Sequence, residues 1–460
     1  MKSQAMHFVP NARAAIKDQN LQKALGHIAE GFVGKRAKAV GVIENWQAIR
    51  EQAAIVKNHT LEHLDHYLAQ YEAAVTARGG VVHYADDAEE ACRIIDQICK
   101  DVGAKSVTKG KSMVSEEVGL NAHLEKSGLD VIETDLGEYI LQLAGEMPSH
   151  IIAPAIHKTK EQVSELFAEH HQRPKLTERT ELVTEARQIL REKFLGADVG
   201  ITGANFLVAE TGQHVLVTNE GNGDLTSCLP KTQVVITGIE KVVPTLEDAG
   251  LMLTLLARSA TGQAFSNYTS FYGGPRQADE GQGPDAFHVV LVDNGRTRML
   301  GNDFREMLRC IRCGACLNHC PVYSSIGGHA YGWVYPGPMG SVVTPNFIGI
   351  DEAGHLPNAC TLNGRCGEVC PMSIPLPAML RKLRDKQAEA KPTPFLMKVW
   401  GNLAKRPKLY HAVTKIGIFA ARMASFNGRL KVPTPWNNER DMPAPEGKTF
   451  QQIYKESRRG

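Results

Sequence analysis

The sequence contains no hydrophobic run long enough to cross a lipid bilayer, which takes about 20 predominantly apolar residues. The longest candidate, residues 416–424, is roughly half that length and contains Arg422. The first twenty residues also lack the apolar core of a secretory signal, because charged and polar residues are spread through them. These absences lead us to expect a cytoplasmic protein, attached at most peripherally to the inner face of the membrane.

A strong excess of charge is missing as well. The chain has 52 Lys and Arg against 50 Asp and Glu, a formal net charge of +2. Nucleic-acid-binding domains usually carry a marked basic excess, so we expect no nucleic acid among the partners. With 460 residues, 43% of them hydrophobic, the chain is long enough for two or three domains.

Acidic residues are absent from one stretch near the C-terminus, residues 391–435. Apolar residues such as Phe395, Val399 and Trp400 recur there at helical spacing, which predicts an amphipathic basic helix. Such a helix can dock on a membrane surface or on an acidic partner subunit, and it can equally pack one face on its own protein. The basic residues of the stretch are Lys391, Lys398, Lys405, Arg406, Lys408, Lys415, Arg422, Arg429 and Lys431.

Seven of the ten cysteines lie in two short runs that each end in Cys-Pro. The runs are Cys310-x2-Cys313-x2-Cys316-x3-Cys320-Pro321 and Cys360-x5-Cys366-x3-Cys370-Pro371. The first run has the spacing of a bacterial-ferredoxin motif, in which three thiolates bind one iron–sulfur cluster and the fourth binds another. Structural zinc usually takes its ligands from two short Cys pairs, and disulfide frameworks belong to small secreted proteins. The two runs therefore predict two iron–sulfur clusters in a protein that transfers electrons.

Interleaving the two runs gives each cluster its ligands. The first set, predicted to hold a 4Fe–4S cluster, is Cys310, Cys313, Cys316 and Cys370. The second set is Cys320, Cys360 and Cys366. Asn363 stands where a fourth thiolate of the second set belongs. The second cluster is therefore either 3Fe–4S or 4Fe–4S, with one iron held by Asn363, by water or by a partner. The remaining cysteines, expected to be small buried hydrophobic residues, are Cys92, Cys99 and Cys228.

Short apolar runs alternate with helix-length segments after a helical first segment, residues 1–75. This alternation predicts an α/β domain with a mainly parallel sheet covered on both faces. We expect this domain to span residues 76–295, followed by a helical cluster module, residues 296–390, and a basic C-terminal region, residues 391–460. The predicted strands are residues 81–84, 106–108, 131–133, 151–153, 199–202, 215–217, 234–236 and 289–292.

Lys109, Lys111 and Ser112 occupy a predicted strand-to-helix turn, where free backbone N–H groups favour anions. A P-loop requires four residues between its two glycines, but six separate Gly103 from Gly110. We therefore expect no nucleotide hydrolysis, and the three side chains are candidates for an anion or substrate pocket.

The residues around the cysteines resemble those of a known protein family. Cys313-Gly-Ala-Cys316, Cys320-Pro-Val-Tyr323 and Cys370-Pro-Met-Ser-Ile-Pro375 are similar to motifs of the iron–sulfur subunit of the bacterial lactate-utilization complex. Members of that family usually have a cysteine at the place of Asn363 and none at the place of Cys360. The x5 spacing is instead similar to that of the succinate dehydrogenase iron–sulfur subunit, whose corresponding set holds a three-iron cluster.

Residues 109–113, 203–206, 209–212 and 219–223 resemble the LUD domain, whose fold is similar to CoA transferases and NagB/RpiA-type sugar-phosphate isomerases. The resemblance to the lactate utilization protein B family covers nearly the whole chain. It implies an iron–sulfur electron-transfer subunit for the oxidation of L-lactate to pyruvate, working with a cysteine-rich subunit and a smaller LUD subunit. By analogy with the glutamates of CoA transferases, Glu210 and Glu220 are candidate pocket residues, with a plain turn or surface role as the alternative.

Two other functions stay open at this point. The α/β domain can be an enzyme in its own right, with acyl-transfer or isomerase chemistry and regulatory clusters. The chain can also be a scaffold in which the clusters are structural.

Overall fold

The computed structural model describes residues 3–26, 28–389, 392–430 and 442–458. The chain forms two compact units, Met1–Asp385 and Lys386–Gly460. Lys391 and Lys431, two of the basic residues expected in the C-terminal region, lie outside the described residues.

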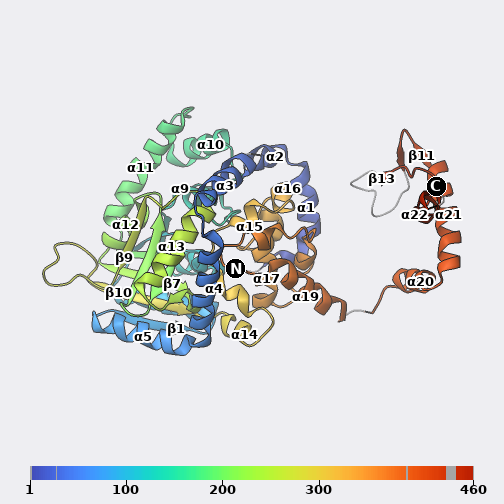
Figure 1. The fold of residues 1–460 in the computed structure, drawn as a ribbon. Helices are drawn as coiled ribbons and strands as arrows, with labels where there is room; N and C mark the ends of the chain where they lie inside the picture. Colours follow the sequence, from blue (N-terminus) through green and yellow to red (C-terminus); the bar gives the residue numbers. More distant parts are fainter. Residues whose placement is uncertain (1–2, 27, 390–391, 431–441, 459–460) are drawn as a thin grey trace. The chain divides into compact units, whose positions relative to one another are not determined.

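A six-stranded, fully parallel sheet forms the centre of the α/β part of the first unit (Figure 1). Its strands 232–238 and 286–292 are rich in valine and are buried along most of their length, as is typical of parallel sheets covered by helices. The prediction of an α/β domain with a mainly parallel sheet is therefore confirmed. In spatial order the strands are β1 (Val81–Ala85), β10 (Ala286–Val292), β7 (Thr232–Gly238), β4 (Val199–Thr202), β2 (Ser106–Gly110) and β3 (Asp130–Glu133).

Alternate residues of the strands pack on opposite faces of this sheet. In β10, Val290 and Val292 belong to the core beneath one layer of helices, whereas Val289 and Leu291 belong to the core beneath α5 (Leu64–Ala77). The first layer consists of α6 (Ala88–Asp101), α7 (Met113–Val118) and α8 (Leu120–Lys126). A second, four-stranded sheet has the spatial order β8 (Val242–Val243), β5 (Phe206–Val208), β6 (Gln213–Thr218) and β9 (Tyr268–Tyr272).

Residues 151–153 do not form the predicted strand. They form bends, and the backbone N–H groups of Ile152 and Ala153 both donate to His150 Nδ1 at 3.0 Å. Ile151 and Ile152 pack against the core that the cluster module shares with the α/β part. The apolar run does mark a partly buried segment, but its N–H groups are bound locally and so do not join a sheet ladder.

Two further groups of helices complete the α/β part. Three helices pack together around Ile132 of β3, at one edge of the parallel sheet. Two more, from distant parts of the chain, pack on each other beside the cluster module. The first group is α9 (Leu136–Ala144), α10 (Lys160–His171) and α11 (Arg179–Gly196), and the second is α4 (Trp46–Glu62) and α13 (Leu246–Ala260).

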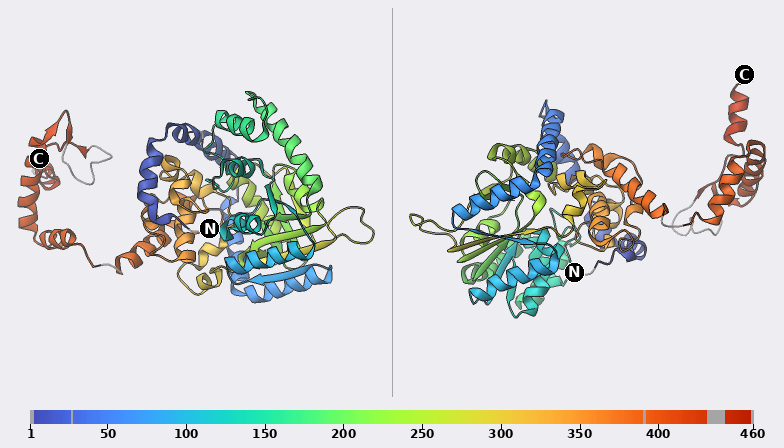
Figure 2. Two further views of the ribbon diagram at one scale, coloured as in Figure 1. Left: turned by 180° about the vertical axis from the view of Figure 1, so that it is seen from behind. Right: turned by 90° about the horizontal axis from the view of Figure 1, so that it is seen from below.

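Short helices make up the cluster module, and the N-terminal helices pack on it. The ring of Phe8 lies 5.5 Å from that of Tyr331, and Arg36 Nη2 donates to the carbonyl of Val369 at 2.8 Å. Figures 1 and 2 show the blue N-terminal helices beside the orange cluster module from several sides. The N-terminal helices are α1 (Phe8–Lys17), α2 (Gln19–Leu25) and α3 (Gly34–Gly41). The module contains α14 (Arg296–Leu300), α15 (Ala315–Asn318), α16 (Tyr323–Ile326), α17 (Gly337–Ile348), α18 (Arg365–Glu368) and α19 (Leu376–Glu389).

Three helices follow α19 in the described part of the second unit, and none of them has a buried residue among those described. Large apolar side chains such as Phe395, Trp400 and Phe419 are exposed. No helix in the described part of the chain is long and apolar enough to cross a membrane. The helices are α20 (Phe395–Ala404), α21 (Pro407–Met423) and α22 (Phe450–Ser457).

Candidate functional site

Four cysteines that are far apart in the sequence meet in the cluster module. They line one small, mostly apolar pocket between α15 and the turn before α19. Burial raises the pKa of the Cys316 thiol well above its ordinary value, and the neighbouring thiols raise it further. The cysteines of this pocket are those of the first set, Cys310, Cys313, Cys316 and Cys370.

The three cysteines of the second set also lie near one another. Burial raises the pKa of Cys366 to about 12, and Cys360 and Cys320 contribute to the same shift. Cys366 in turn contributes to the raised pKa of Cys316, which belongs to the first set. The two sets of cysteines therefore adjoin.

The two cysteine runs fold as a structural repeat. In each run the residue two positions after the first cysteine has a positive φ, 58° at Arg312 and 55° at Leu362, and its N–H points at that cysteine's sulfur. A glycine with positive φ then precedes a short helix, Gly314 before α15 and Gly364 before α18. Glycine fits this left-handed conformation because it has no Cβ.

This repeat places Asn363 at the position that Cys313 occupies in the first run. The Asn363 side chain is exposed, and its Oδ1 accepts the N–H of Arg365 at 3.3 Å. A carboxamide oxygen is a hard ligand, whereas iron–sulfur clusters select soft thiolates. The second set thus has three thiols and no fourth.

The chemistry of the two sets fits iron–sulfur clusters. All seven thiols are free rather than joined in disulfides. Backbone N–H groups point at the sulfurs of Cys310, Cys320, Cys360 and Cys370 at 3.2–3.5 Å, and such hydrogen bonds tune cluster sulfurs. Buried thiols that oppose one another's ionisation release their protons when a metal binds.

The three cysteines outside the runs differ from one another in exposure. Cys92 and Cys99 are buried in the helix layer over the sheet, as expected. Cys228, at the end of α12 (Asn222–Cys228), is exposed, so the expectation of a buried residue is wrong there. Only Thr226, Ser227 and their neighbours on the inner side of this short helix are buried.

A cavity of about 560 Å³ lies between the parallel sheet and the cluster module. It opens at the carboxyl ends of β2 and β4. From β2 the chain passes outward to the edge strand β3, and it then returns to form β4 on the other side of β2. Such a reversal of strand order is where open α/β sheets bind ligands. The loops after the two strands lie so close that a Cβ on Gly203 would come within 2.5 Å of the Lys111 carbonyl oxygen.

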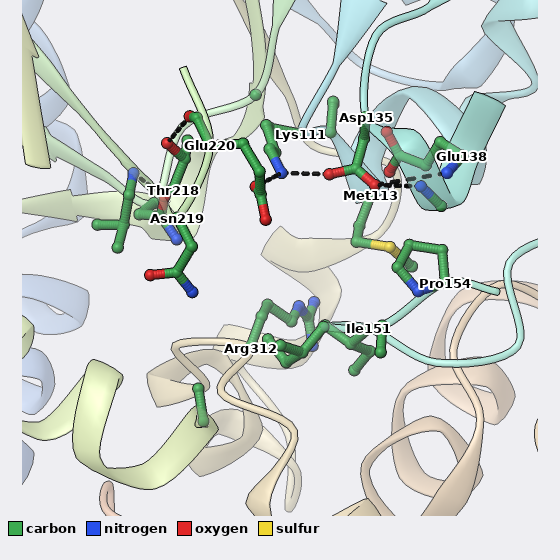
Figure 3. A pocket seen from close by; sticks show the side chains of 18 of the residues that line it. Lys111, Met113, Asp135, Glu138, Ile151, Pro154, Thr218, Asn219, Glu220 and Arg312 are labelled. Atoms are coloured by element: carbon green, nitrogen blue, oxygen red, sulfur yellow. Dashed lines mark hydrogen bonds and ion pairs between the residues drawn. The ribbon is translucent and has the colours of Figure 1, made fainter. Parts of the chain in front are cut away.

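Three of the five residues predicted for an anion or substrate pocket line this cavity. Lys111 Nζ forms ion pairs with Asp135 and with Glu220, the latter at 2.8 Å (Figure 3). Ser112 lines the cavity as well, and its hydroxyl caps α7 by accepting the N–H of Ser115.

The other two residues lie outside the cavity lining. The ammonium of Lys109 is fully buried among Glu116 at 2.6 Å and Glu133 at 2.7 Å. Glu210 accepts the N–H of Leu246 at 2.7 Å, where α13 begins. Both side chains thus make structural contacts. The sequence motifs alone do not show whether a side chain makes such a contact or lines a pocket.

Sequence reasoning missed two cationic residues of the cavity wall. Arg312, inside the first cysteine run, lines both the cavity and the cysteine pocket, and its guanidinium lies 4.7 Å from the centre of the Tyr335 ring. Lys241 follows β7 and lines the cavity too. Burial lowers the pKa of Lys241 to about 8, and the charge of Arg312 contributes. The sequence did contain one signal for Lys241, because the charged pair Glu240-Lys241 interrupts an apolar run.

Comparison with known proteins agrees with this arrangement. The LUD domain family matches residues 68–292, the 4Fe-4S dicluster domain family residues 306–374, and the family "Lactate utilisation protein B, C-terminal" residues 376–459. The chain thus carries an iron–sulfur domain of the dicluster type. A solved DUF162 family structure from Deinococcus radiodurans is similar over 50% of this chain and 98% of its own, with 15% identity and a TM-score of 0.29.

Curated relatives match over the full length. Proteins named "Lactate utilization protein B" are 43% identical in Anoxybacillus flavithermus, over 99% of both chains, and 42% identical in Bacillus velezensis, over 99% of this chain and 98% of the relative. The relative of the same name from Lysinibacillus sphaericus is 41% identical, over 100% of this chain and 99% of its own. The chain therefore belongs to the lactate utilization protein B family.

Proposed function

We propose that this chain is the iron–sulfur electron-transfer subunit of a complex that oxidises L-lactate to pyruvate. The observation that carries the proposal is the pair of adjoining thiol sets, one with four cysteines and one with three. The dicluster family match and the name shared by the relatives support it. Lactate oxidation releases two electrons, and two neighbouring one-electron centres suit that number.

In this proposal the first set, Cys310, Cys313, Cys316 and Cys370, holds a 4Fe–4S cluster, and the second set, Cys320, Cys360 and Cys366, holds a 3Fe–4S cluster. When bound, such clusters accept and release single electrons at potentials set by charge, hydrogen bonding and exposure. The three-iron assignment follows from Asn363, whose amide replaces the thiolate that a fourth iron needs.

Two arginines outside the cysteine runs bind backbone carbonyls at and beside Cys370. Arg50 donates two hydrogen bonds, at 2.6 and 3.0 Å, to the carbonyl of Cys370, and Arg36 donates to the carbonyl of the preceding residue. Their positive charges favour added negative charge and so raise the reduction potential of the first set's cluster. Met339 and Met372 line the same pocket and exclude water from it.

We propose further that a cysteine-rich subunit and a smaller LUD subunit complete the complex. The second unit of this chain suits docking on an acidic membrane surface or on an acidic partner. Its described helices α20 and α21 expose apolar side chains and carry basic residues without acidic ones.

Replacing Cys366 by serine tests the proposal. The variant should lose the second cluster and electron transfer from lactate, while the α/β part stays folded, because Cys366 belongs to the second set and not to the sheet. Iron content, paramagnetic resonance and lactate-dependent reduction of an artificial acceptor by the reconstituted complex are the measurements. Cys228→Ser, at an exposed cysteine outside both sets, is the matched control and should behave as the unmodified protein. Normal lactate-dependent electron transfer by Cys366→Ser would refute the proposal.

A further inference from the structure

The cavity beside the cluster module has one wall with a buried ammonium group that is not hydrogen-bonded within the described part of the chain. Lys241 is only 7% exposed, and its ammonium makes no hydrogen bond or ion pair with any residue in the described part of the chain. Buried charges in proteins are normally paired. An ammonium that lines a cavity without a partner therefore points to an anion as the missing group.

The nearby carboxylates are already engaged by other cations. Both oxygens of Glu117 bind Arg296 at 2.9 Å. Glu240 Oε2 binds Arg296 Nε at 2.7 Å, and Glu240 Oε1 lies 3.7 Å from Arg312 Nη2. Three cations thus share two carboxylates. Glu240 and Cys310 also act on Lys241 electrostatically, but neither forms a hydrogen bond or ion pair with its ammonium group.

The opposite wall carries more acidic than basic side chains. Lys111 is paired with both Asp135 and Glu220, so one cation there faces two acids. Figure 3 shows these three side chains across the cavity from Arg312 and Ile151. An anionic ligand is therefore directed to the wall formed by Lys241 and Arg312.

The rest of the lining suits a short carbon chain with one oxygen substituent. Ile236, Leu256 and Ala257 supply apolar surface. Burial raises the pKa of Glu138 well above its ordinary value, and the nearby Glu133 and Asp135 raise it further. Its Oε2 has no hydrogen-bond partner among the described residues. A carboxyl group accepts a hydrogen bond from a hydroxyl group, and in its protonated form it also donates one to a hydroxyl or keto oxygen.

We infer that this cavity binds a small 2-hydroxy or 2-oxo carboxylate, whose carboxylate group lies on Lys241 and Arg312. The choice of acid rests on the proposed function, whereas the anion and its orientation rest on the charges of the cavity. Because Arg312 and Ile151 also line the cysteine pocket, the ligand would lie directly beside the first set.

Isothermal titration calorimetry of the anaerobically purified full chain tests the inference. L-Lactate, pyruvate and inorganic phosphate are titrated separately into the unmodified protein and three variants. Lactate or pyruvate should bind, and Lys241→Gln should weaken that binding about tenfold or more, since a charge-assisted hydrogen bond is lost. Lys241→Arg keeps the charge and should retain most of the affinity. Lys105→Gln removes an exposed lysine outside the cavity lining and should change nothing.

Several outcomes would overturn the inference: no binding of either carboxylate, equal binding by Lys241→Gln, or binding of phosphate alone. If Lys241→Gln does not fold, Thr261→Phe fills part of the cavity from its wall and should weaken binding to a similar extent; unchanged binding by that variant also counts against the inference. Paramagnetic resonance on the same samples separates the two proposals. Clusters without carboxylate binding contradict only the cavity assignment, and carboxylate binding by a chain that takes up no iron contradicts only the electron-transfer function.

Discussion

At the scale of single residues, the clusters that we assign to this chain depend on which side chain occupies each ligand position in two similar loops. Both runs use the same backbone turn, with a positive φ at Arg312 and at Leu362. They differ at Cys313 and Asn363, and that difference leads us to assign a three-iron cluster to the second set.

Asn363→Cys should convert the second cluster to the four-iron form, because the repeat puts the new thiol where Cys313 stands in the first run. The oxidised protein should lose the paramagnetic resonance signal of a three-iron cluster, and the iron content should rise. Asn363→Ser is the control for loss of the amide and should keep the signal. A three-iron signal that persists in the cysteine variant would contradict the assignment.

A second residue-scale effect concerns stability in acid. His214 is fully buried in β6, between the rings of Tyr272 at 5.2 Å and Phe287 at 5.6 Å. Burial lowers the pKa of His214 from 6.5 to about 3. The unfolded chain therefore binds a proton at this residue below pH 6.5, while the folded chain does not until about pH 3. The stability from this residue is complete above pH 6.5 and is lost as the pH falls.

His214→Phe should remove that part of the acid sensitivity. At pH 5.5 the unmodified protein should have lost on the order of 1 kcal/mol of its free energy of unfolding through this one histidine. Urea denaturation at pH 7.5 and 5.5 measures the difference between the two proteins. An equal loss of stability in both would show that the buried ring is not the source.

Much of the residue-scale chemistry could be predicted from the sequence, but not all of it. The cysteine sets were predictable because cluster motifs depend on local spacing. Lys109 and Lys111 could not be distinguished, since only the packing of the folded chain decides which of the two lysines meets Glu116 and Glu133. Lys241 and Arg312 were missed because they come from distant segments that meet only in the folded chain.

At the scale of elements, the strands were easier to predict than their surroundings. The β-branched runs of the sheet are buried on both faces, and this gives them a clear pattern in the sequence. Residues 151–153 have a similar composition but serve as a contact with the cluster module, where His150 binds their N–H groups. The packing of α1 and α3 on the cluster module rests on contacts between distant chain segments, such as Arg36 with Val369, which are 333 positions apart.

The elements of the α/β part and the cluster module are joined by one buried network. Arg296, at the start of α14, binds Glu117 of α7 and Glu240 after β7, and the hydroxyl of Tyr335 donates to Glu117 at 2.6 Å. All of these side chains are almost completely buried. The network therefore fixes the cluster module against the sheet.

Arg296→Ala should destabilise the first unit by about 3–5 kcal/mol, because it leaves two buried carboxylates without their partner. Arg276→Ala is the matched control: its partner Asp285 is at a similar distance, 2.7 Å, but both side chains are largely exposed. That variant should change the stability far less, because an exposed ion pair is screened by solvent. The urea midpoint of each protein is the measurement, and similar midpoints for the two variants would contradict a structural role for the network.

At the scale of the whole molecule, the first unit contains a cavity beside two sets of cysteines, and the second unit is basic with exposed apolar side chains. The cavity is bounded by both the α/β part and the cluster module, so neither part contains the complete site. This explains why composition and motifs could predict each part, while the site between them required the tertiary structure.

The C-terminal unit should attach the full chain to acidic lipid vesicles and not to neutral ones. Exposed residues such as Phe395 and Trp400 can enter the interface, and the basic side chains attract anionic headgroups. Co-sedimentation should fall strongly when Lys398, Lys405 and Lys408 are changed to glutamate. Equal sedimentation with both kinds of vesicle, or no sedimentation with either, would leave an acidic partner subunit as the docking surface.

The central claim is that the seven cysteines of the two runs hold a pair of redox-active iron–sulfur centres. Paramagnetic resonance of the anaerobically purified protein, first oxidised and then reduced, tests it most directly. We predict a three-iron signal in the oxidised sample and a four-iron signal in the reduced one. A protein that gives neither signal, and in which the cysteines bind zinc instead, would contradict the account.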